Sequence, residues 1–241
     1  MQWPSRLWVI RHGESAGNIA WRRALDMGTP RIDITDRDMD VPLSPLGIRQ
    51  AQALGAWFAR EGLKPDAVFS SPYARARQTA DITTDVMKAP KPVFDERLRE
   101  REFGVLDRLT AAGIQQFYPE QAELRAAVGK FYYRPPAGES WCDVLLRLRA
   151  ALDAICLHHA GQQVVIFTHE VVVFCFRYLL EGLDEAAILA IDKAGDVANC
   201  AVTEYAREGE ALNLVRYNFT TPLEEAQTPV TAEPANRPSG A

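Results

Sequence analysis

The stretch RLWVIRHGESAGN, residues 6–18, decides how the chain folds. Its apolar run Leu7-Trp8-Val9-Ile10 is typical of a buried strand, and Arg11-His12-Gly13 marks a turn at the carboxyl end of that strand. Two further apolar runs, residues 67–69 and 164–167, repeat the pattern, because each is followed by polar residues and a helix start. Strands that alternate with helices predict an α/β fold, a three-layer α/β/α sandwich around a mostly parallel sheet.

Serine followed by proline marks two of the helix starts outside this stretch. Ser44-Pro45 predicts a helix that ends at Gly62, and Ser71-Pro72 predicts one that continues to about Met87. Ser140 predicts the start of a long amphipathic helix. The other elements are expected as follows: loop at residues 22–42 and mainly loop at 88–110, a short helix at 110–128, and strands at 197–205 and 211–218.

These elements predict one domain over residues 1–219, in which residues 105–137 form a lid over the functional site. From residue 220 to residue 241 the chain has few large apolar residues and four prolines, a composition that predicts a disordered tail. The four cysteines are widely spaced and are expected to be reduced.

The composition limits the partners that the chain can have. Of its 241 residues 47% are hydrophobic, and the formal net charge is -5, which argues against a nucleic-acid or anionic-membrane surface. The N-terminus lacks a basic region followed by a long apolar stretch, so no signal peptide is expected. A cytoplasmic protein that acts on a small substrate is predicted, and the sequence is silent on oligomeric state.

Cationic and imidazole side chains follow the carboxyl ends of the three predicted strands. This edge of an open α/β sheet is where ligands bind. Paired arginines and histidines there suit a doubly charged tetrahedral anion, because a guanidinium presents paired donors to phosphate oxygens. The residues are Arg11, His12, Arg75 and His169.

At this point the sequence resembles a known family. RHGESAGN at residues 11–18 is similar to the RHGExxxN signature of the histidine phosphatase superfamily, the phosphoglycerate-mutase-like branch. Further segments resemble the same family in the same order: LSPLG (43–47), SSPYARARQTA (70–80), LREREFG (98–104), GES (138–140) and VIFTH (165–169).

The resemblance implies a role for six residues. His12 would be the nucleophile and would form a phosphohistidine, and Glu100 would be the general acid. Arg11, Asn18, Arg75 and His169 would hold the phosphoryl oxygens. No metal or other cofactor is implied, because cationic side chains can stabilise the transferring phosphoryl group. No cluster of Cys or His at ligand spacing predicts a metal site either.

Several points stay open at the level of sequence. Glu96 and Glu102 lie near Glu100 and could take its role, and Asn18 could simply bond to the local backbone. The family usually has glycine where this chain has Glu170, a carboxylate that would repel a phosphate unless it points away or pairs with a cation. The segment Val105-Leu106-Asp107-Arg108 also departs from the family, so substrate identity does not carry over.

Three functions fit these residues. A comparatively short segment between Glu100 and the GES turn favours a phosphatase that hydrolyses a phosphomonoester. The alternatives are a 2,3-bisphosphoglycerate-dependent phosphoglycerate mutase and a catalytically inactive module that recognises phosphate.

Overall fold

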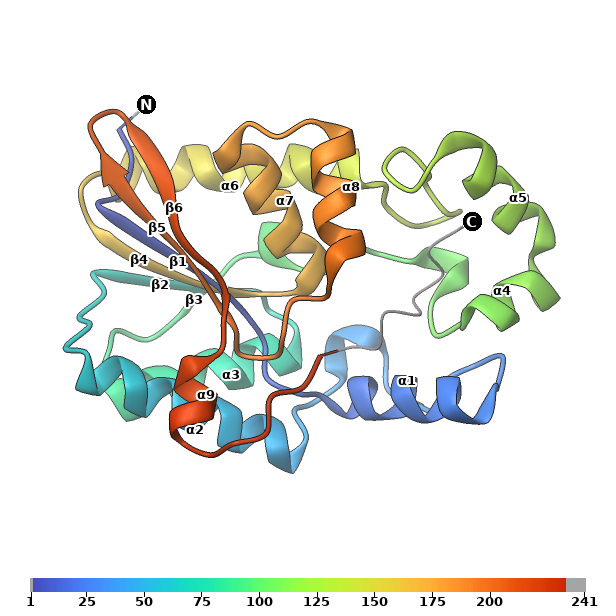
Figure 1. Ribbon diagram of the computed structural model, residues 1–241, viewed down its shortest axis with the longest axis horizontal. Helices are drawn as coiled ribbons and strands as arrows, with labels where there is room; N and C mark the ends of the chain where they lie inside the picture. Colours follow the sequence, from blue (N-terminus) through green and yellow to red (C-terminus); the bar gives the residue numbers. More distant parts are fainter. Residues whose placement is uncertain (1, 233–241) are drawn as a thin grey trace.

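A computed structural model describes residues 2–232, which build a six-stranded sheet between two layers of helices (Figure 1). The strand order is β3-β2-β4-β1-β5-β6. Strands β1 to β4 run parallel, whereas β5 and β6 pair antiparallel at one edge. The mostly parallel α/β/α sandwich is therefore confirmed. The strands are β1 (Arg6–Arg11), β2 (Ala67–Ser70), β3 (Val93–Phe94), β4 (Gln163–Thr168), β5 (Val202–Glu208) and β6 (Ala211–Phe219).

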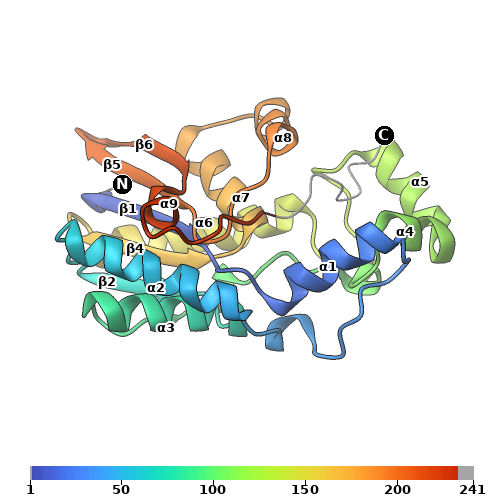
Figure 2. The same cartoon turned by 60° about the horizontal axis from the view of Figure 1, so that its bottom comes forward.

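Helices cover both faces of the sheet, which is why its central strands are apolar on both sides. Leu7 and Val9 of β1 belong to the core under helices α6 (Trp141–His158) and α7 (Glu170–Glu181). Trp8 and Ile10 belong to the core under α2 (Pro45–Arg60) and α3 (Ala74–Met87). Figure 2 shows the two layers on opposite sides of the sheet, with α8 (Glu185–Ala194) beside α7.

Beyond the carboxyl ends of the parallel strands lie α1 (Ala16–Met27), α4 (Ala111–Phe117) and α5 (Pro119–Val128) (Figures 1 and 2). The helix α1 corrects the expected loop at 22–42. Its start is signalled by Ser15 and Asn18, which form a capping box, and its end by Gly28 in the left-handed conformation. The single helix expected at 110–128 is divided at Pro119, since proline lacks the N–H that would continue α4.

The segment 105–137, called the cap segment below, lies beyond the carboxyl ends of the parallel strands, and its action as a lid stays a prediction (Figures 1 and 2). It has a small core of its own, made of Leu106, Leu109, Ile114 and Tyr133. Gly113 packs closely on the loop that follows α1. An added Cβ on Gly113 would lie 1.8 Å from the carbonyl oxygen of Pro30 in that loop. The cap segment is thus anchored to the loop that follows α1.

The prediction of a disordered tail is wrong for residues 220–232. Residues Thr221–Glu225 form α9, and Leu223 is fully buried in the same core cluster as Leu54 and Phe58 of α2. Further on, Gln50 Nε2 donates to the carbonyl oxygen of Pro229, at 2.9 Å, and to Thr231 Oγ1, at 3.0 Å. A low count of apolar residues predicted disorder, but one well-placed leucine and a few backbone contacts suffice to dock the chain. The rest of the expected tail, residues 233–241, lies outside the described residues.

Docking of this segment predicts that Leu223→Ala lowers the free energy of unfolding by about 2–4 kcal/mol, the usual cost of emptying a buried leucine site. Val230→Ala is the matched control, because it shortens an apolar side chain of the same segment that is exposed in the folded protein. It should change the free energy by less than about 0.5 kcal/mol. Urea unfolding measures both values, and equal small effects would mean that α9 does not contribute to the core.

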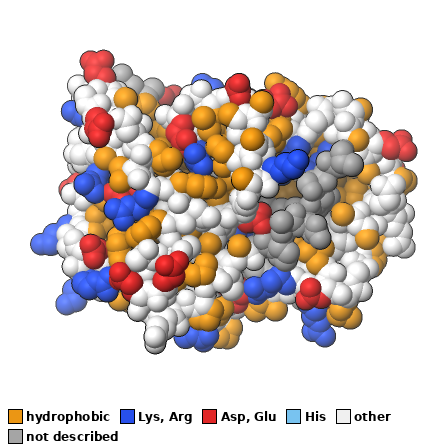
Figure 3. Space-filling model, in the orientation of Figure 1, with side chains coloured by type: hydrophobic (Ala, Val, Ile, Leu, Met, Phe, Trp, Pro, Cys, Tyr) orange, Lys and Arg blue, Asp and Glu red, His pale blue; other side chains and the backbone are white. Residues whose placement is uncertain are grey.

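The surface, the helices and the cysteines have three further features. On the face in Figure 3, acidic and basic side chains are interspersed. Within residues 2–232 no helix combines the length and the apolar character needed to cross a membrane. All four cysteines are unbonded; Cys142 is half-buried and the other three are buried.

Candidate active site

His12 stands at the carboxyl end of β1 and is held in place through its backbone. Its N–H donates to the carbonyl oxygen of Thr168 at 2.9 Å, and its own carbonyl oxygen accepts from Asn199 Nδ2 at 3.1 Å. The turn that follows is packed directly on the start of α2. A Cβ on Gly47 would lie 2.0 Å from the carbonyl oxygen of Glu14, so only glycine fits there. This contact gives a physical reason for the glycine in LSPLG.

The ring of His12 has its tautomer set by its neighbours. Nδ1 lies 2.7 Å from the carbonyl oxygen of Gly13, which can only accept, so Nδ1 carries the hydrogen. Nε2 is then left with its lone pair and accepts a hydrogen bond of 3.3 Å from Arg75 Nε. A neutral imidazole with its lone pair on Nε2 is the form that can attack phosphorus.

Arg75 reaches His12 from the first turn of α3 and is 6% exposed. Its Nη1 atom lies 3.0 Å from Asp38 Oδ1, in an ion pair that the sequence analysis did not anticipate. The guanidinium also stacks over the ring of Tyr73, with Cζ 5.2 Å from the ring centroid. Arg77, two residues further along α3, is exposed. Arg75 is therefore the arginine of this segment that faces the site, as expected.

His169 is fully buried and stands at the N-cap position of α7, where its side chain makes no capping hydrogen bond. Its ring lies 5.1 Å from that of His12 between centroids, and its Nε2 lies 2.8 Å from Ser71 Oγ. Burial, together with the positive charge of Arg75 nearby, lowers the pKa of His169 well below its ordinary value. The ring is neutral at physiological pH. Within residues 2–232, its Nδ1 atom is buried without a hydrogen-bond partner.

Glu170 pairs with a cation. The sequence analysis gave this as one of two arrangements, the other being a side chain that points away, in which the carboxylate would not repel a bound phosphate. Its Oε1 atom lies 3.5 Å from Arg11 Nη1 and accepts from the N–H of Val197 at 3.0 Å. Arg11 in turn donates to the carbonyl oxygen of Val197. Arg11 and Glu170 are each 1% exposed, so the carboxylate compensates a guanidinium that burial would otherwise disfavour.

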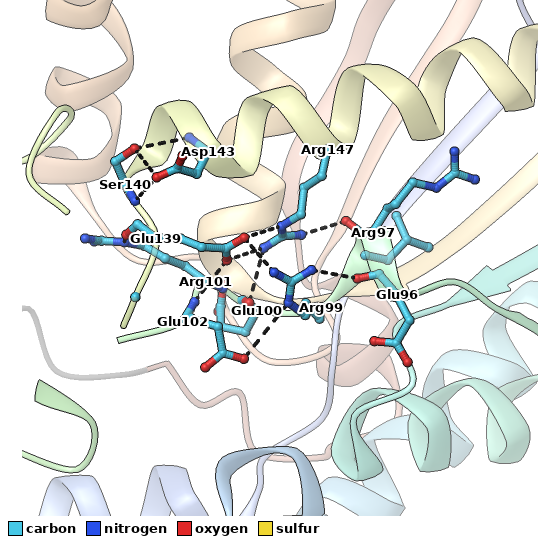
Figure 4. Close-up of polar contacts among 12 residues, drawn as sticks. Glu96, Arg97, Arg99, Glu100, Arg101, Glu102, Glu139, Ser140, Asp143 and Arg147 are labelled. Carbon is cyan, nitrogen blue, oxygen red and sulfur yellow. Dashed lines mark hydrogen bonds and ion pairs between the residues drawn. The ribbon is translucent and has the colours of Figure 1, made fainter. Parts of the chain in front are cut away.

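The three glutamates of the charged loop at residues 95–102 have clearly different surroundings. Glu100 is 7% exposed and lines the same cavity as His12. Glu96 is exposed, and Glu102 accepts a hydrogen bond from the hydroxyl of Tyr73. Arg147 Nη2 donates to the carbonyl oxygen of Glu100 at 3.2 Å and, with Arg99, also binds Glu139 (Figure 4). The network fixes the backbone from which Glu100 points into the cavity.

Asn18 bonds to the local backbone, which was the alternative role considered for it, and its side chain also reaches the cavity. Its Oδ1 accepts from the N–H of Ser15 at 2.9 Å as part of the cap of α1, and it lies 3.4 Å from Asn199 Nδ2. The side chain nevertheless lines the cavity beside His12.

A cavity of about 170 Å³ brings these groups together. Four of the six expected residues line it: His12, Asn18, Arg75 and Glu100. Arg11 and His169 are buried next to this group and are not among the lining residues. Tyr133 and Trp141 also line the cavity, whereas Tyr132 is exposed. Among the described residues, no group of three or more Cys, His, Asp or Glu is placed to hold a metal ion.

The residues missed from the sequence come mainly from the cap segment and the loop after α1. Asp38 belongs to a short 3₁₀ helix in that loop, and nothing in its local sequence marks it as a partner of Arg75. Several basic side chains of the cavity were also missed; they are Arg101, Arg108, Arg125 and Lys130. A basic residue in a charged loop is usually solvated, so only the three-dimensional arrangement could single these out.

The family model of the histidine phosphatase superfamily (branch 1) matches residues 7–220, which include every residue of this site. The chain belongs to the histidine phosphatase superfamily. A relative within the superfamily, the probable phosphoglycerate mutase GpmB of Yersinia pestis (strain Pestoides F), is 31% identical over 180 residues, which cover 74% of this chain and 75% of the relative.

Solved structures of the superfamily fold agree. YhfR of Bacillus stearothermophilus is 25% identical with a TM-score of 0.70, and the match covers 89% of this chain and 96% of that one. A mycobacterial glucosyl-3-phosphoglycerate phosphatase, solved with VO3, is similar in fold, with 24% identity, a TM-score of 0.70, and coverage of 89% of this chain and 99% of that one. Phosphatases and a mutase thus both stand among the similar proteins.

Proposed function

We propose that the protein is a phosphatase that hydrolyses a phosphomonoester through a phosphohistidine on His12. The observation that carries the proposal is the state of the His12 ring: Nδ1 is committed to the carbonyl oxygen of Gly13, and Nε2 keeps its lone pair beside Arg75. Glu100 lines the same cavity, so a nucleophile, a cation and a carboxyl group would all adjoin an ester bound there. An inactive binding module would need the cation but neither the fixed tautomer nor the carboxyl group.

The proposed reaction has two steps. In the first, the lone pair of His12 Nε2 forms a bond to phosphorus, the bond from phosphorus to the ester oxygen breaks, and Glu100 in its acid form gives its proton to the departing alkoxide. In the second, the Glu100 carboxylate takes a proton from water, the water oxygen bonds to phosphorus, and the N–P bond breaks. Inorganic phosphate leaves, and His12 and Glu100 return to their starting states.

Fixed positive charge stabilises the phosphoryl group during its transfer. Arg75 is the cation in contact with Nε2, at 3.3 Å. Asn18 lines the cavity next to it, and the unpartnered Nδ1 of the neutral His169 could donate to a phosphoryl oxygen. Arg11 is engaged by Glu170 and Val197, so we propose that it supplies charge from behind His12.

The second candidate is a phosphoglycerate mutase, favoured by the similarity to GpmB. A mutase must keep water from the phosphohistidine, and mutases of this family usually cover the site with a longer insertion before the GES turn. Here the segment between Glu100 and the GES turn, residues 101–137, is comparatively short, which supports hydrolysis.

Two assays separate the functions. Phosphate release from a panel of phosphorylated metabolites is expected, with turnover that exceeds any isomerisation of 3-phosphoglycerate primed with 2,3-bisphosphoglycerate by at least about tenfold. Isomerisation faster than phosphate release would assign the mutase function. Tight binding of inorganic phosphate with neither reaction would assign the inactive module.

A further inference from the structure

Two buried side-chain amides hold the turn at residues 12–14. Gln50 of α2 accepts at Oε1 from the N–H of Glu14, at 2.8 Å. Asn199, in the loop before β5, donates from Nδ2 to the carbonyl oxygen of His12, at 3.1 Å. Both amides are fully buried, so each of their polar atoms needs a partner within the protein.

The remaining atoms of the two amides meet at Thr231 in the C-terminal segment. Thr231 Oγ1 lies 3.0 Å from Gln50 Nε2 and 2.9 Å from Asn199 Oδ1. The N–H of Glu14 can only donate and the carbonyl group of His12 can only accept, so both amide orientations are fixed. The hydroxyl group of Thr231 must therefore accept from Gln50 and donate to Asn199. A continuous series of hydrogen bonds, called the amide chain below, runs from Glu14 to His12.

Backbone contacts of the same segment keep Thr231 in place. The N–H of Asn199 donates to the carbonyl oxygen of Thr231 at 2.7 Å, and Gln50 Nε2 donates also to that of Pro229 at 2.9 Å. The lining of the cavity does not include Gln50, Asn199 or Thr231. Any effect of these three residues on the reaction must therefore pass through the turn that they hold.

The amide chain affects the ring of His12 through the peptide between Gly13 and Glu14. In a trans peptide the C=O and N–H groups lie in one plane and point in opposite directions, and no peptide bond within residues 2–232 is cis. Gln50 holds the N–H of this peptide, so its carbonyl oxygen, that of Gly13, is aimed back at His12 Nδ1, 2.7 Å away. The partner of Nδ1 is thus set by a side chain of α2.

The preceding peptide, between His12 and Gly13, is held at both of its polar groups. Asn199 donates to its carbonyl oxygen, and its N–H donates to Thr79 Oγ1 at 3.0 Å. With both peptide planes fixed, the acceptor of the Nδ1 hydrogen stays in place and the lone pair stays on Nε2. If the turn rotated, Nδ1 would lose this acceptor, and the tautomer with hydrogen on Nε2, which cannot attack phosphorus, would gain population.

We propose that Gln50, Asn199 and Thr231 are positioning residues for the nucleophile: the amide chain holds the turn so that His12 keeps its hydrogen on Nδ1 and its lone pair on Nε2. The C-terminal segment is in this way part of the active centre as well as a support for the core. The proposal rests on the proposed function for its effect on turnover, whereas the tautomer is a property of the free protein.

Nitrogen-15 NMR of the histidine rings measures the tautomer without substrate, and the His12 signals are those absent from His12→Ala. At a pH where the ring is neutral, the wild-type protein should carry the hydrogen on Nδ1. Thr231→Val keeps the size of the side chain but removes the hydroxyl group, and should raise the ratio of the Nε2–H form to the Nδ1–H form by about tenfold, the scale on which one hydrogen bond shifts an equilibrium. Gln50→Met also removes the acceptor of the Glu14 N–H and should shift the ratio further.

Two further variants at hydroxyl side chains of the same segment are the controls. Thr231→Ser keeps the hydroxyl group and should keep the wild-type tautomer. Thr228→Val removes a hydroxyl group that, among the described residues, donates only to the carbonyl oxygen of Ala226, at 3.4 Å, and should also leave the tautomer unchanged.

Turnover adds a second measurement. The single-turnover rate of His12 phosphorylation should fall in Thr231→Val and Gln50→Met by at least the factor by which the Nδ1–H share falls. KM should stay within about twofold, because neither residue lines the cavity. A shifted tautomer in a protein that hydrolyses no ester would support the positioning role and reject only the proposed function. Hydrogen that stays on Nδ1 in both variants, even with slower turnover or a lower melting temperature, would overturn the positioning role, as would a wild-type ring with its hydrogen on Nε2.

Discussion

Replacing His12 with alanine is expected to reduce turnover by roughly four orders of magnitude or more, the scale on which enzymes lose activity when a covalent nucleophile is removed. The ring is the group whose Nε2 keeps a lone pair in the cavity, since Gly13 holds the hydrogen on Nδ1. His169 lies 5.1 Å away between ring centroids but is fully buried, and its Nε2 is engaged by Ser71. We therefore do not expect His169 to substitute for His12.

Rapid quenching with a ³²P-labelled ester measures the intermediate directly. A phosphohistidine is labile in acid and stable in base, so the label should show that pattern in the wild-type protein and be absent from His12→Ala. His158→Ala is the control, because His158 is exposed at the end of α6, away from the cavity lining. Label that persists in His12→Ala, or that proves acid-stable, would contradict the assignment of the nucleophile.

The fold and the proximity of His12, Arg75 and His169 could be predicted from the sequence, because both depend on where the strands end. An apolar strand ends directly at His12, and another ends directly at His169, so parallel pairing of β1 with β4 must bring the two histidines to one edge. Arg75 follows for the same reason from the end of β2 and the start of α3. These relations need only the strand ends and a parallel sheet.

What the sequence could not supply are contacts between distant segments. The partner of Arg75, Asp38, lies 37 residues away in a loop without a helical or strand pattern. Glu170 forms an ion pair with Arg11, 3.5 Å away, and the residue type alone could not show whether the carboxylate would pair with a cation or repel a phosphate. The docked segment at 220–232 depends on one buried leucine, too little for a composition argument.

The role of Glu100 predicts a loss that depends on the leaving group. An alkoxide is strongly basic and needs a proton as its bond to phosphorus breaks, whereas nitrophenolate leaves without one. Glu100→Gln keeps the shape of the side chain and its place in the cavity but cannot give up a proton. Phosphorylation of His12 by an alkyl phosphate should therefore slow by about a hundredfold or more, the usual scale of general acid catalysis. Phosphorylation by nitrophenyl phosphate should slow much less.

The comparison must use the single-turnover burst, because Glu100 would also be the base for water in the proposed second step, and its loss would then slow dephosphorylation for both esters. Glu96→Gln and Glu102→Gln are the matched controls. Glu96 is exposed and Glu102 is bound by the hydroxyl of Tyr73, so neither should show a loss that depends on the leaving group.

Equal losses for both esters in Glu100→Gln would reject proton donation, and a selective loss in either control would move the role to that neighbour. A carboxyl group that is 7% exposed, in a cavity shared with an unprotonated imidazole nitrogen, is the arrangement that a leaving-group proton requires, and we expect the selective loss at Glu100 alone of these three glutamates.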